Sequence, residues 1–299
     1  ILSLLYIGGI VFLFVILAII VFTFFGLWID VFYPIVATIL MYLGFTFRKY
    51  IFEMQKRQLL ENELSIAKNI QQSFLPKEKP KVEGIDIEAK MLTARQVGGD
   101  LYDFVSVSEK KAGVMIGDVA GKGVPAALYM AKVVSEFKSY AREDSASEAL
   151  VKLNDRLVSE GGSSLFVTLC YMLFDMDKMS LNFSLGGHSP ILMMRDGENE
   201  LRKLDLKEGM PLGIMEGLFS NGTVDVKKGD IFVVYTDGVT EAMNTKHEMF
   251  GDDKLAEIIK KQRSKSIGEI VDVIHDEVSK FEGKAPQHDD ITVIAVKVI

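Results

Sequence analysis

The chain has 299 residues, of which 48% are hydrophobic and 25% charged, with a formal net charge of −7. Residues 1–47 contain one charged side chain, Asp30, while all 34 basic residues and the other 40 acidic ones lie in the remaining 252 positions. This split excludes a simple soluble enzyme, a collagen-like fibre and a disordered tail. The single cysteine, Cys170, excludes a disulfide scaffold and a cysteine-rich zinc module. The negative charge argues against nucleic acid as a partner. Because the sequence begins at Ile1, we expect it to be the C-terminal part of a longer protein.

Two apolar segments, residues 1–25 and 31–47, predict two transmembrane helices, since about 20 apolar residues suffice to cross the hydrocarbon of a bilayer. A secretory signal peptide would need a basic start and a cleavage site, which this segment lacks. A buried helical hairpin is the remaining alternative. Basic residues follow the second segment directly, and positive flanks stay on the cytoplasmic side of a membrane. The sequence therefore predicts a multi-pass cell-membrane protein whose soluble part is cytoplasmic; the basic residues are Arg48, Lys49, Lys56 and Arg57.

Residues 48–83 are predicted to form a juxtamembrane linker, with a helix over 52–75 that ends before Pro76. The excess of basic residues in this linker favours contact with anionic lipid headgroups. Leu60, Ala67 and Phe74 recur at intervals of seven, which makes about two heptads. The pattern leaves two interpretations open: a spacer helix, or a helix that forms a homodimer and carries a signal.

Residues 84–299 are long enough for one domain and alternate between strand-like and helix-like segments. Because tight turns join most of the strands, we expect an α+β fold with antiparallel sheets. The expected strands include 85–92, 112–116, 165–174, 180–185, 231–235 and 291–298, and the expected helices are 124–141, 147–159, 253–262 and 267–281.

Four aspartates stand beside apolar strands of this domain. Asp118 and Asp237 end strands, Asp289 opens one, and Asp100 follows another. Carboxylates that crowd together repel one another unless cations lie between them. Ligation by oxygen alone suits Mg²⁺ or Mn²⁺. Two such ions can hold a bridging hydroxide and bind a phosphate group, so this pattern predicts phosphate chemistry.

An ordered set of short motifs resembles the metal-dependent PPM-type serine/threonine phosphatases, in particular the bacterial branch of SpoIIE and RsbU. Each motif alone is weakly specific, whereas the whole set in this order is highly specific. One departure is the sequence Leu-Gly-Gly-His at 185–188, where the family often has Asn-Ala-Gly-His. The motifs are IQQSFLP at 70–76, VGGDLYD at 97–103, GDVAGKG at 117–123, FVT at 166–168, GHSP at 187–190, PLG at 211–213, YTDGVTEA at 235–242 and DDIT at 289–292.

The resemblance implies a fold of two stacked antiparallel sheets between helices, and it also implies roles for single residues. Asp118 would bridge two metal ions, with the Val119 carbonyl on one of them and Asp237 and Asp289 on the other. Asp100 would bind more loosely, through water. Asp290 would contact the residues that bind the metal ions without binding an ion itself.

The expected reaction is hydrolysis of phosphoserine or phosphothreonine on a regulatory protein, such as a phosphorylated anti-sigma-factor antagonist, by a hydroxide bound between the two metals. The non-enzymatic alternative is a pseudophosphatase that only binds a partner. The segment GLWIDVFYP at 26–34 is similar to the last transmembrane hairpin of CHASE-type-2 sensors, which implies an upstream sensor.

Other phosphate enzymes fit the sequence less well. A cysteine-dependent phosphatase needs an arginine shortly after its cysteine, and no arginine stands at that spacing after Cys170. A sensor kinase needs a Gly-rich ATP-binding region after its phosphoacceptor histidine, and none follows His275. The residues after Asp100 do not match a diguanylate cyclase. We expect His188 and His288 to shape turns rather than donate protons. Lys122 has two open interpretations, attraction of phosphate or a solvated loop charge.

Overall fold

The computed structural model describes residues 2–28, 30–161, 164–206 and 209–299. It divides into two compact units, residues 1–63 and 64–299. The helices are α1 (Leu2–Phe25), α2 (Phe32–Phe74), α3 (Val124–Tyr140), α4 (Ala146–Glu160), α5 (Asp252–Lys261) and α6 (Ile267–Glu282). The strands are β1 (Ile85–Leu92), β2 (Asp100–Ser108), β3 (Lys111–Val119), β4 (Val167–Asp175), β5 (Ser180–Gly186), β6 (Ile191–Met194), β7 (Leu201–Leu204), β8 (Gly222–Asp225), β9 (Ile231–Tyr235) and β10 (Ile291–Val298).

The N-terminal unit consists of α1 and the first part of α2. Gly8–Phe25 and α2 are each long and apolar enough to span a membrane, and neither apolar window is buried inside the protein. Large side chains such as Phe12, Phe24 and Trp28 are exposed. Exposed apolar area of this extent indicates a membrane or a partner, although a signal sequence has the same composition.

Helix α2 is one continuous helix of 43 residues, so the second apolar segment and the linker helix are not separate elements. The sequence pattern predicts a helix over 52–75 that is separate from the one over 31–47, whereas the structure joins them. Residues 45–74 contain neither proline nor glycine, so nothing in this stretch breaks the hydrogen-bond ladder. The helix ends at Phe74, just before Pro76.

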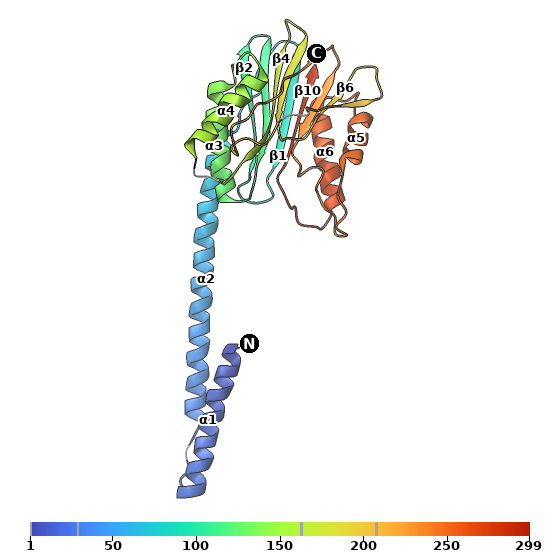
Figure 1. Cartoon of the computed structure of the whole chain (residues 1–299). Helices are drawn as coiled ribbons and strands as arrows, with labels where there is room; N and C mark the ends of the chain where they lie inside the picture. Colours follow the sequence, from blue (N-terminus) through green and yellow to red (C-terminus); the bar gives the residue numbers. More distant parts are fainter. Residues whose placement is uncertain (1, 29, 162–163, 207–208) are drawn as a thin grey trace. The chain divides into compact units, whose positions relative to one another are not determined.

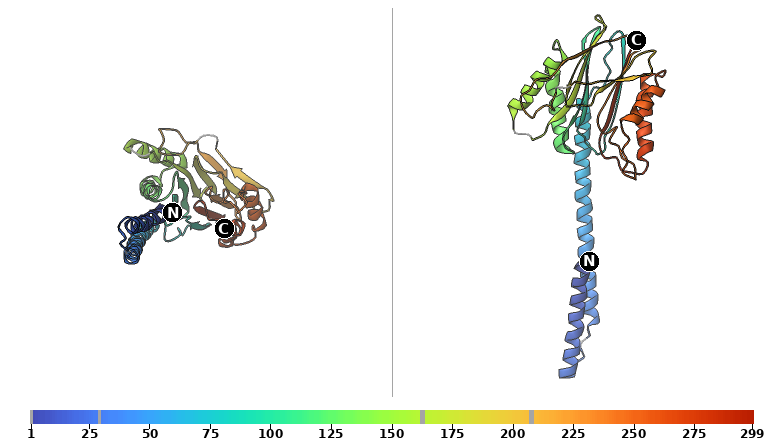
Figure 2. Two further views of the ribbon diagram at one scale, coloured as in Figure 1. Left: turned by 90° about the horizontal axis from the view of Figure 1, so that it is seen from below. Right: turned by 45° about the vertical axis from the view of Figure 1, so that its right-hand side comes forward.

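The C-terminal unit contains two five-stranded sheets whose paired strands are all antiparallel. One sheet has the order β1-β10-β9-β6-β7 and the other β2-β3-β4-β5-β8. Helices α3 and α4 cover the outer face of the second sheet, and α5 and α6 cover the outer face of the first (Figures 1 and 2). The expected α+β sandwich between helices is therefore confirmed.

The alternation of apolar residues along the strands explains this layering. In β3, Val114 and Ile116 face the layer between the sheets, whereas Met115 faces the helices. Phe174 of one sheet meets Phe232 of the other, with ring centroids 5.4 Å apart and ring planes at 74°. Burial on both faces makes these strands nearly continuous apolar segments, and it holds the two sheets together.

Candidate metal centre

The four predicted aspartates come from the adjoining ends of both sheets. Asp100 begins β2 and pairs in register with Asp118 on β3. Asp237 lies in the turn after β9, and Asp289 lies two residues before β10. The charges of Asp237 and Asp289 both act on Asp118. The fold therefore brings together acids that are up to 189 positions apart in the sequence.

The carboxyl group of Asp118 lies at the centre of this cluster. Burial raises its pKa most, and the charges of Asp237, Asp289 and Asp290 raise it further, to about 7, although a hydrogen bond with Asp100 acts in the opposite direction. Burial and the nearby carboxylates thus both disfavour the ionised form of Asp118, and a bound cation would favour it.

Asp100 is buried, with 2% of its surface exposed. Its Oδ2 accepts a hydrogen bond of 2.8 Å from the Thr236 hydroxyl and another from the Thr292 hydroxyl. Burial, followed by the charge of Asp118, raises the pKa of Asp100 well above its usual range. Because Thr236 follows β9 and Thr292 lies on β10, Asp100 of one sheet is bonded to the other sheet. Sequence reasoning missed both threonines, although they lie inside the motifs.

Asp290 holds the loop that leads into β2. Its Oδ1 accepts from the backbone N–H of Ala94 at 2.8 Å, and its Oδ2 accepts from the N–H of Gly99 at 2.8 Å. Both carboxylate oxygens thus face the loop at 93–99. The expected role of Asp290 as a support for ligands stays a prediction, and these contacts are compatible with it.

Two glycines are needed for the close approach of these loops. A Cβ on Gly99 would lie 2.8 Å from the Val119 carbonyl oxygen and 3.1 Å from Asp118 Oδ1. A Cβ on Gly238 would lie 1.9 Å from the carbonyl oxygen of Asp290. Side chains at these positions would push the loops apart, so both glycines set the spacing of the site.

Asp289 has a cationic neighbour. Lys122 Nζ donates to Asp289 Oδ2 at 2.6 Å and to the carbonyl oxygen of His288 at 2.7 Å. Asp289 Oδ1 accepts from the N–H of Asp290 at 3.0 Å.

Partial burial raises the pKa of Asp237, as do Glu241 and Asp289, whereas the Gly238 N–H and Lys122 lower it.

The chemistry of these groups fits hard divalent cations. Within the ranges that the structure describes, no three His, Cys, Asp or Glu side chains are close enough to hold an ion as they stand. Burial and the neighbouring carboxylates nevertheless raise the pKa of Asp118, and these groups are oxygen donors, the donor type that Mg²⁺ and Mn²⁺ prefer. The ligand set Asp100, Asp118, Val119, Asp237 and Asp289 remains a prediction that these donors support.

The histidines of the motifs differ in exposure. His188 is buried, its Nδ1 lies 3.0 Å from the Thr168 hydroxyl, and burial lowers its pKa to about 4. A histidine that is neutral at physiological pH is a weak proton donor, which favours the interpretation that it shapes a turn. His288 is exposed, and it meets Lys122 through its backbone carbonyl.

The end of α2 also contacts the loop at 93–99. Gln71 is buried, and its side-chain amide donates to the carbonyl of Gly98 at 2.6 Å and accepts from the N–H of Gly98 at 3.2 Å. Gln71 and Asp290 therefore hold neighbouring residues of one loop, Gly98 and Gly99, next to Asp100. Phe74 and Leu75 add apolar contacts with the core, whereas Ile70 is exposed.

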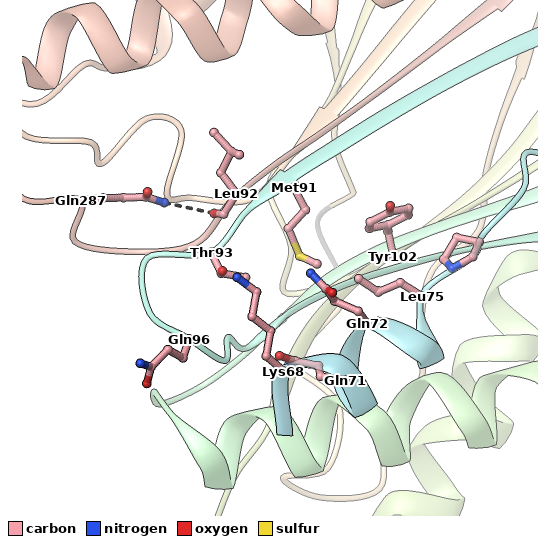
Figure 3. A pocket seen from close by; sticks show the side chains of 11 residues that line it. Lys68, Gln71, Gln72, Leu75, Met91, Leu92, Thr93, Gln96, Tyr102 and Gln287 are labelled. Carbon is pink, nitrogen blue, oxygen red and sulfur yellow. Dashed lines mark hydrogen bonds between the residues drawn. The ribbon is translucent and has the colours of Figure 1, made fainter. Parts of the chain in front are cut away.

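A hollow of about 570 Å³ lies on the other side of this loop, between the end of α2 and the end of β1 (Figure 3). Thr93 and Gln96 of the loop border it, as does Gln287, which donates to the carbonyl of Leu92 at 3.1 Å. Because the loop has open space on this side, its position depends on its contacts with Gln71 and Asp290.

The arrangement of two antiparallel sheets between helices, with acids at the adjoining strand ends, defines a PPM-type phosphatase fold. Solved structures share this fold. The SiaA-PP2C domain of Pseudomonas aeruginosa has a TM-score of 0.71 at 22% identity, over 81% of this chain and 98% of that one. The catalytic domain of the serine/threonine phosphatase PstP, solved in complex with two manganese ions, has a TM-score of 0.55 at 14% identity, over 72% of this chain and 99% of that one.

Sequence comparison gives the family. Residues 108–299 match the family described as Stage II sporulation protein E (SpoIIE). The phosphoserine phosphatase RsbU of Bacillus subtilis is 31% identical over 243 residues, which cover 81% of this chain and 71% of RsbU. The chain therefore belongs to the SpoIIE family of PPM-type phosphatases, and it is an enzyme of the phosphoserine phosphatase class that its homologues represent.

Proposed function

We propose that this chain is a membrane-anchored phosphatase that removes phosphate from serine or threonine of a regulatory protein. The observation that carries the proposal is the convergence of Asp100, Asp118, Asp237 and Asp289 from both sheets, together with the pKa of about 7 at Asp118. The relative RsbU is named a phosphoserine phosphatase, which supports the substrate class. A small regulator such as a phosphorylated anti-sigma-factor antagonist is the substrate that we expect.

Each part of the site has a task in this reaction. Two Mn²⁺ or Mg²⁺ ions, when bound, would lower the pKa of water and neutralise the charge of the phosphate. Asp118, Asp237, Asp289 and the carbonyl of Val119 would hold them, with Asp100 contributing through water. Thr236 and Thr292 fix the orientation of Asp100, and Gly99 and Gly238 allow the loops to close on one another.

The N-terminal unit is proposed to be the membrane anchor. Its exposed apolar side chains and its two sufficiently long helices support this, and the basic residues from Arg48 onward favour a cytoplasmic catalytic domain. We divide the chain into transmembrane helices at 1–47, a linker at 48–83 and the phosphatase domain at 84–299. The similarity of residues 26–34 to CHASE-type-2 sensors supports control by an upstream sensor.

The linker is proposed to form a homodimer. Leu59, Ile66 and Ile70 are exposed apolar residues on α2, spaced seven and four apart, so they lie on one face of the helix. An exposed apolar face of this kind favours pairing with a second copy. Leu64 and Phe74 are less suitable for this contact, because Leu64 is half-buried and Phe74 packs against the core of its own domain.

Metal-dependent turnover tests this proposal against the non-enzymatic alternative, a pseudophosphatase, which no observation in the structure favours. The full chain in detergent should hydrolyse a phosphoserine peptide with Mn²⁺ or Mg²⁺ and lose this activity with a chelator. Asp118→Asn and Asp237→Asn should each lower kcat by at least about 100-fold, since each removes a charged ligand. Asp155→Asn is the matched control, because Asp155 is exposed on α4.

Asp103 is unsuitable as a control, although it lies close to Asp100 in the sequence. Its side chain is 3% exposed and lies 3.7 Å from Lys138, so its loss would disturb folding. Absence of turnover by the wild-type chain with either metal would refute the enzyme proposal. Full activity of both Asp118→Asn and Asp237→Asn would refute the assigned site.

A further inference from the structure

Lys122 is a basic residue on the loop between β3 and α3, and it contacts one of the proposed metal ligands. Its ammonium group lies 2.6 Å from Asp289 Oδ2 and 2.7 Å from the carbonyl oxygen of His288. The side chains of Lys122 and Asp289 are 44% and 41% exposed. An ion pair this exposed contributes little to folding stability, so stability alone does not explain its position.

The position of this ammonium group conflicts with ion binding. Asp289 Oδ1 accepts the N–H of Asp290 at 3.0 Å, and Oδ2 accepts from Lys122. A divalent ion held by Asp289 would lie close to this ammonium group, and the two cations would repel one another. The backbone donor of Asp290 is fixed at the start of β10, whereas the exposed side chain of Lys122 has four rotatable bonds. Repulsion by the ion therefore favours movement of Lys122 away from Asp289.

The displaced ammonium group would remain beside the reacting group. Lys122 lines a small cleft together with Gly99, His288 and Asp289, next to the carbonyl of Val119. Within the described residues that line this cleft, Arg95 is the other cation. A phosphoryl group held at the neighbouring carboxylates through divalent ions carries negative oxygens, which are the natural partners of an ammonium group.

We propose that Lys122 exchanges partners: it neutralises Asp289 before the divalent ion binds, and it binds the phosphoryl oxygens of the substrate afterwards. This inference rests on the proposed function and deepens it. Lys122 would therefore weaken metal binding and strengthen phosphate binding. These opposite effects distinguish it from a solvated loop residue, whose removal would change neither affinity.

The test compares Lys122→Met with Lys110→Met in the full chain in detergent. Lys110 is a matched control, because it is 46% exposed and paired with Asp177 at 3.2 Å, on the turn between β2 and β3. Calorimetric titration with Mn²⁺ should show binding about two- to fivefold tighter for Lys122→Met, the range of one exposed ion pair, and unchanged for Lys110→Met. Inorganic phosphate should bind the Mn²⁺-loaded Lys122→Met variant about tenfold more weakly.

Each outcome decides a part of the inference. If Lys122→Met binds Mn²⁺ with equal or weaker affinity than the wild type, Lys122 does not compete with the ion. If its affinity for phosphate is unchanged, Lys122 does not bind the phosphoryl oxygens. A wild-type chain that binds no Mn²⁺ overturns the proposed function and this inference with it. Thermal unfolding confirms that both variants are folded, which their exposed positions lead us to expect.

Discussion

The contact between Gln71 and Gly98 gives a sharp prediction about how α2 supports the site. Gln71→Leu keeps the size of the side chain but removes two hydrogen bonds, of 2.6 and 3.2 Å, to the backbone of Gly98. A hydrogen bond within a protein contributes about 0.5–1.5 kcal/mol net, so the two contribute about 1–3 kcal/mol. Gly98 precedes Gly99, whose carbonyl oxygen accepts from the N–H of Val119 at 3.3 Å, so loss of the two bonds weakens the loop beside the proposed metal ligands.

If metal binding must restore the loop to its position, the loss of about 1–3 kcal/mol with the two hydrogen bonds reduces the binding free energy of Mn²⁺. The affinity should then fall by about 5- to 150-fold, since 1.4 kcal/mol corresponds to a factor of ten. Calorimetric titration of the full chain measures this affinity, and amide hydrogen exchange at Gly98 and Gly99 reports opening of the loop. Gln72→Leu is the matched control, because Gln72 is the exposed neighbour on the same helix turn.

Two results would refute this reasoning. The first is wild-type Mn²⁺ affinity in Gln71→Leu, which would mean that the loop holds its position without α2. The second is a similar loss of affinity in Gln72→Leu, which would mean that the effect is a general disturbance of the helix.

Three further predictions concern pH, the loops and the dimer. Because the pKa of Asp118 is raised from 3.8 to about 7 in the folded, metal-free protein, its stabilising effect is greatest below pH 3.8 and is lost as the pH rises toward 7. Thermal unfolding of the metal-free chain should therefore show lower stability at pH 8 than at pH 5, and Mn²⁺ affinity should increase over the same range; a flat profile would contradict both. Gly238→Ala should lower kcat by at least about tenfold, because its Cβ would lie 1.9 Å from the Asp290 carbonyl oxygen, and full activity would contradict the assigned spacing. Leu59→Glu with Ile66→Glu should convert a dimer into a monomer in sedimentation, with Glu61→Gln on the opposite face of the helix as the control, whereas a dimer that survives would place the contact elsewhere.

The sequence predicts the layers of the domain well, because the strand signals are local. Segments such as 231–235 and 291–298 are apolar throughout, and the structure has β9 and β10 at these positions. The aspartates were found for the same reason: each stands at a recognisable strand end. The order of the motifs along the chain indicates the family, and the family implies a role for each aspartate, which apolar patterns alone do not do.

Other features of the site could not be predicted from local patterns. Gln71 is an ordinary polar residue in a helical sequence, and its burial appears only when the loop at 93–99 folds onto α2. The bonds from Thr236 and Thr292 to Asp100 depend on the two sheets meeting. The continuity of α2 could have been inferred, since no helix breaker separates Phe47 from Phe52.

The position of β10 in its sheet has a consequence for the timing of synthesis. This strand lies between β1 and β9, yet among the described strands it is the last to be translated. Until it arrives, β1 and β9 have no common neighbour, Asp100 lacks the Thr292 hydroxyl, and the loop at 93–99 lacks Asp290. The apolar segments of residues 1–47 thus leave the ribosome before the C-terminal unit, and we expect no hydrolysis until β10 has been translated and has joined its sheet.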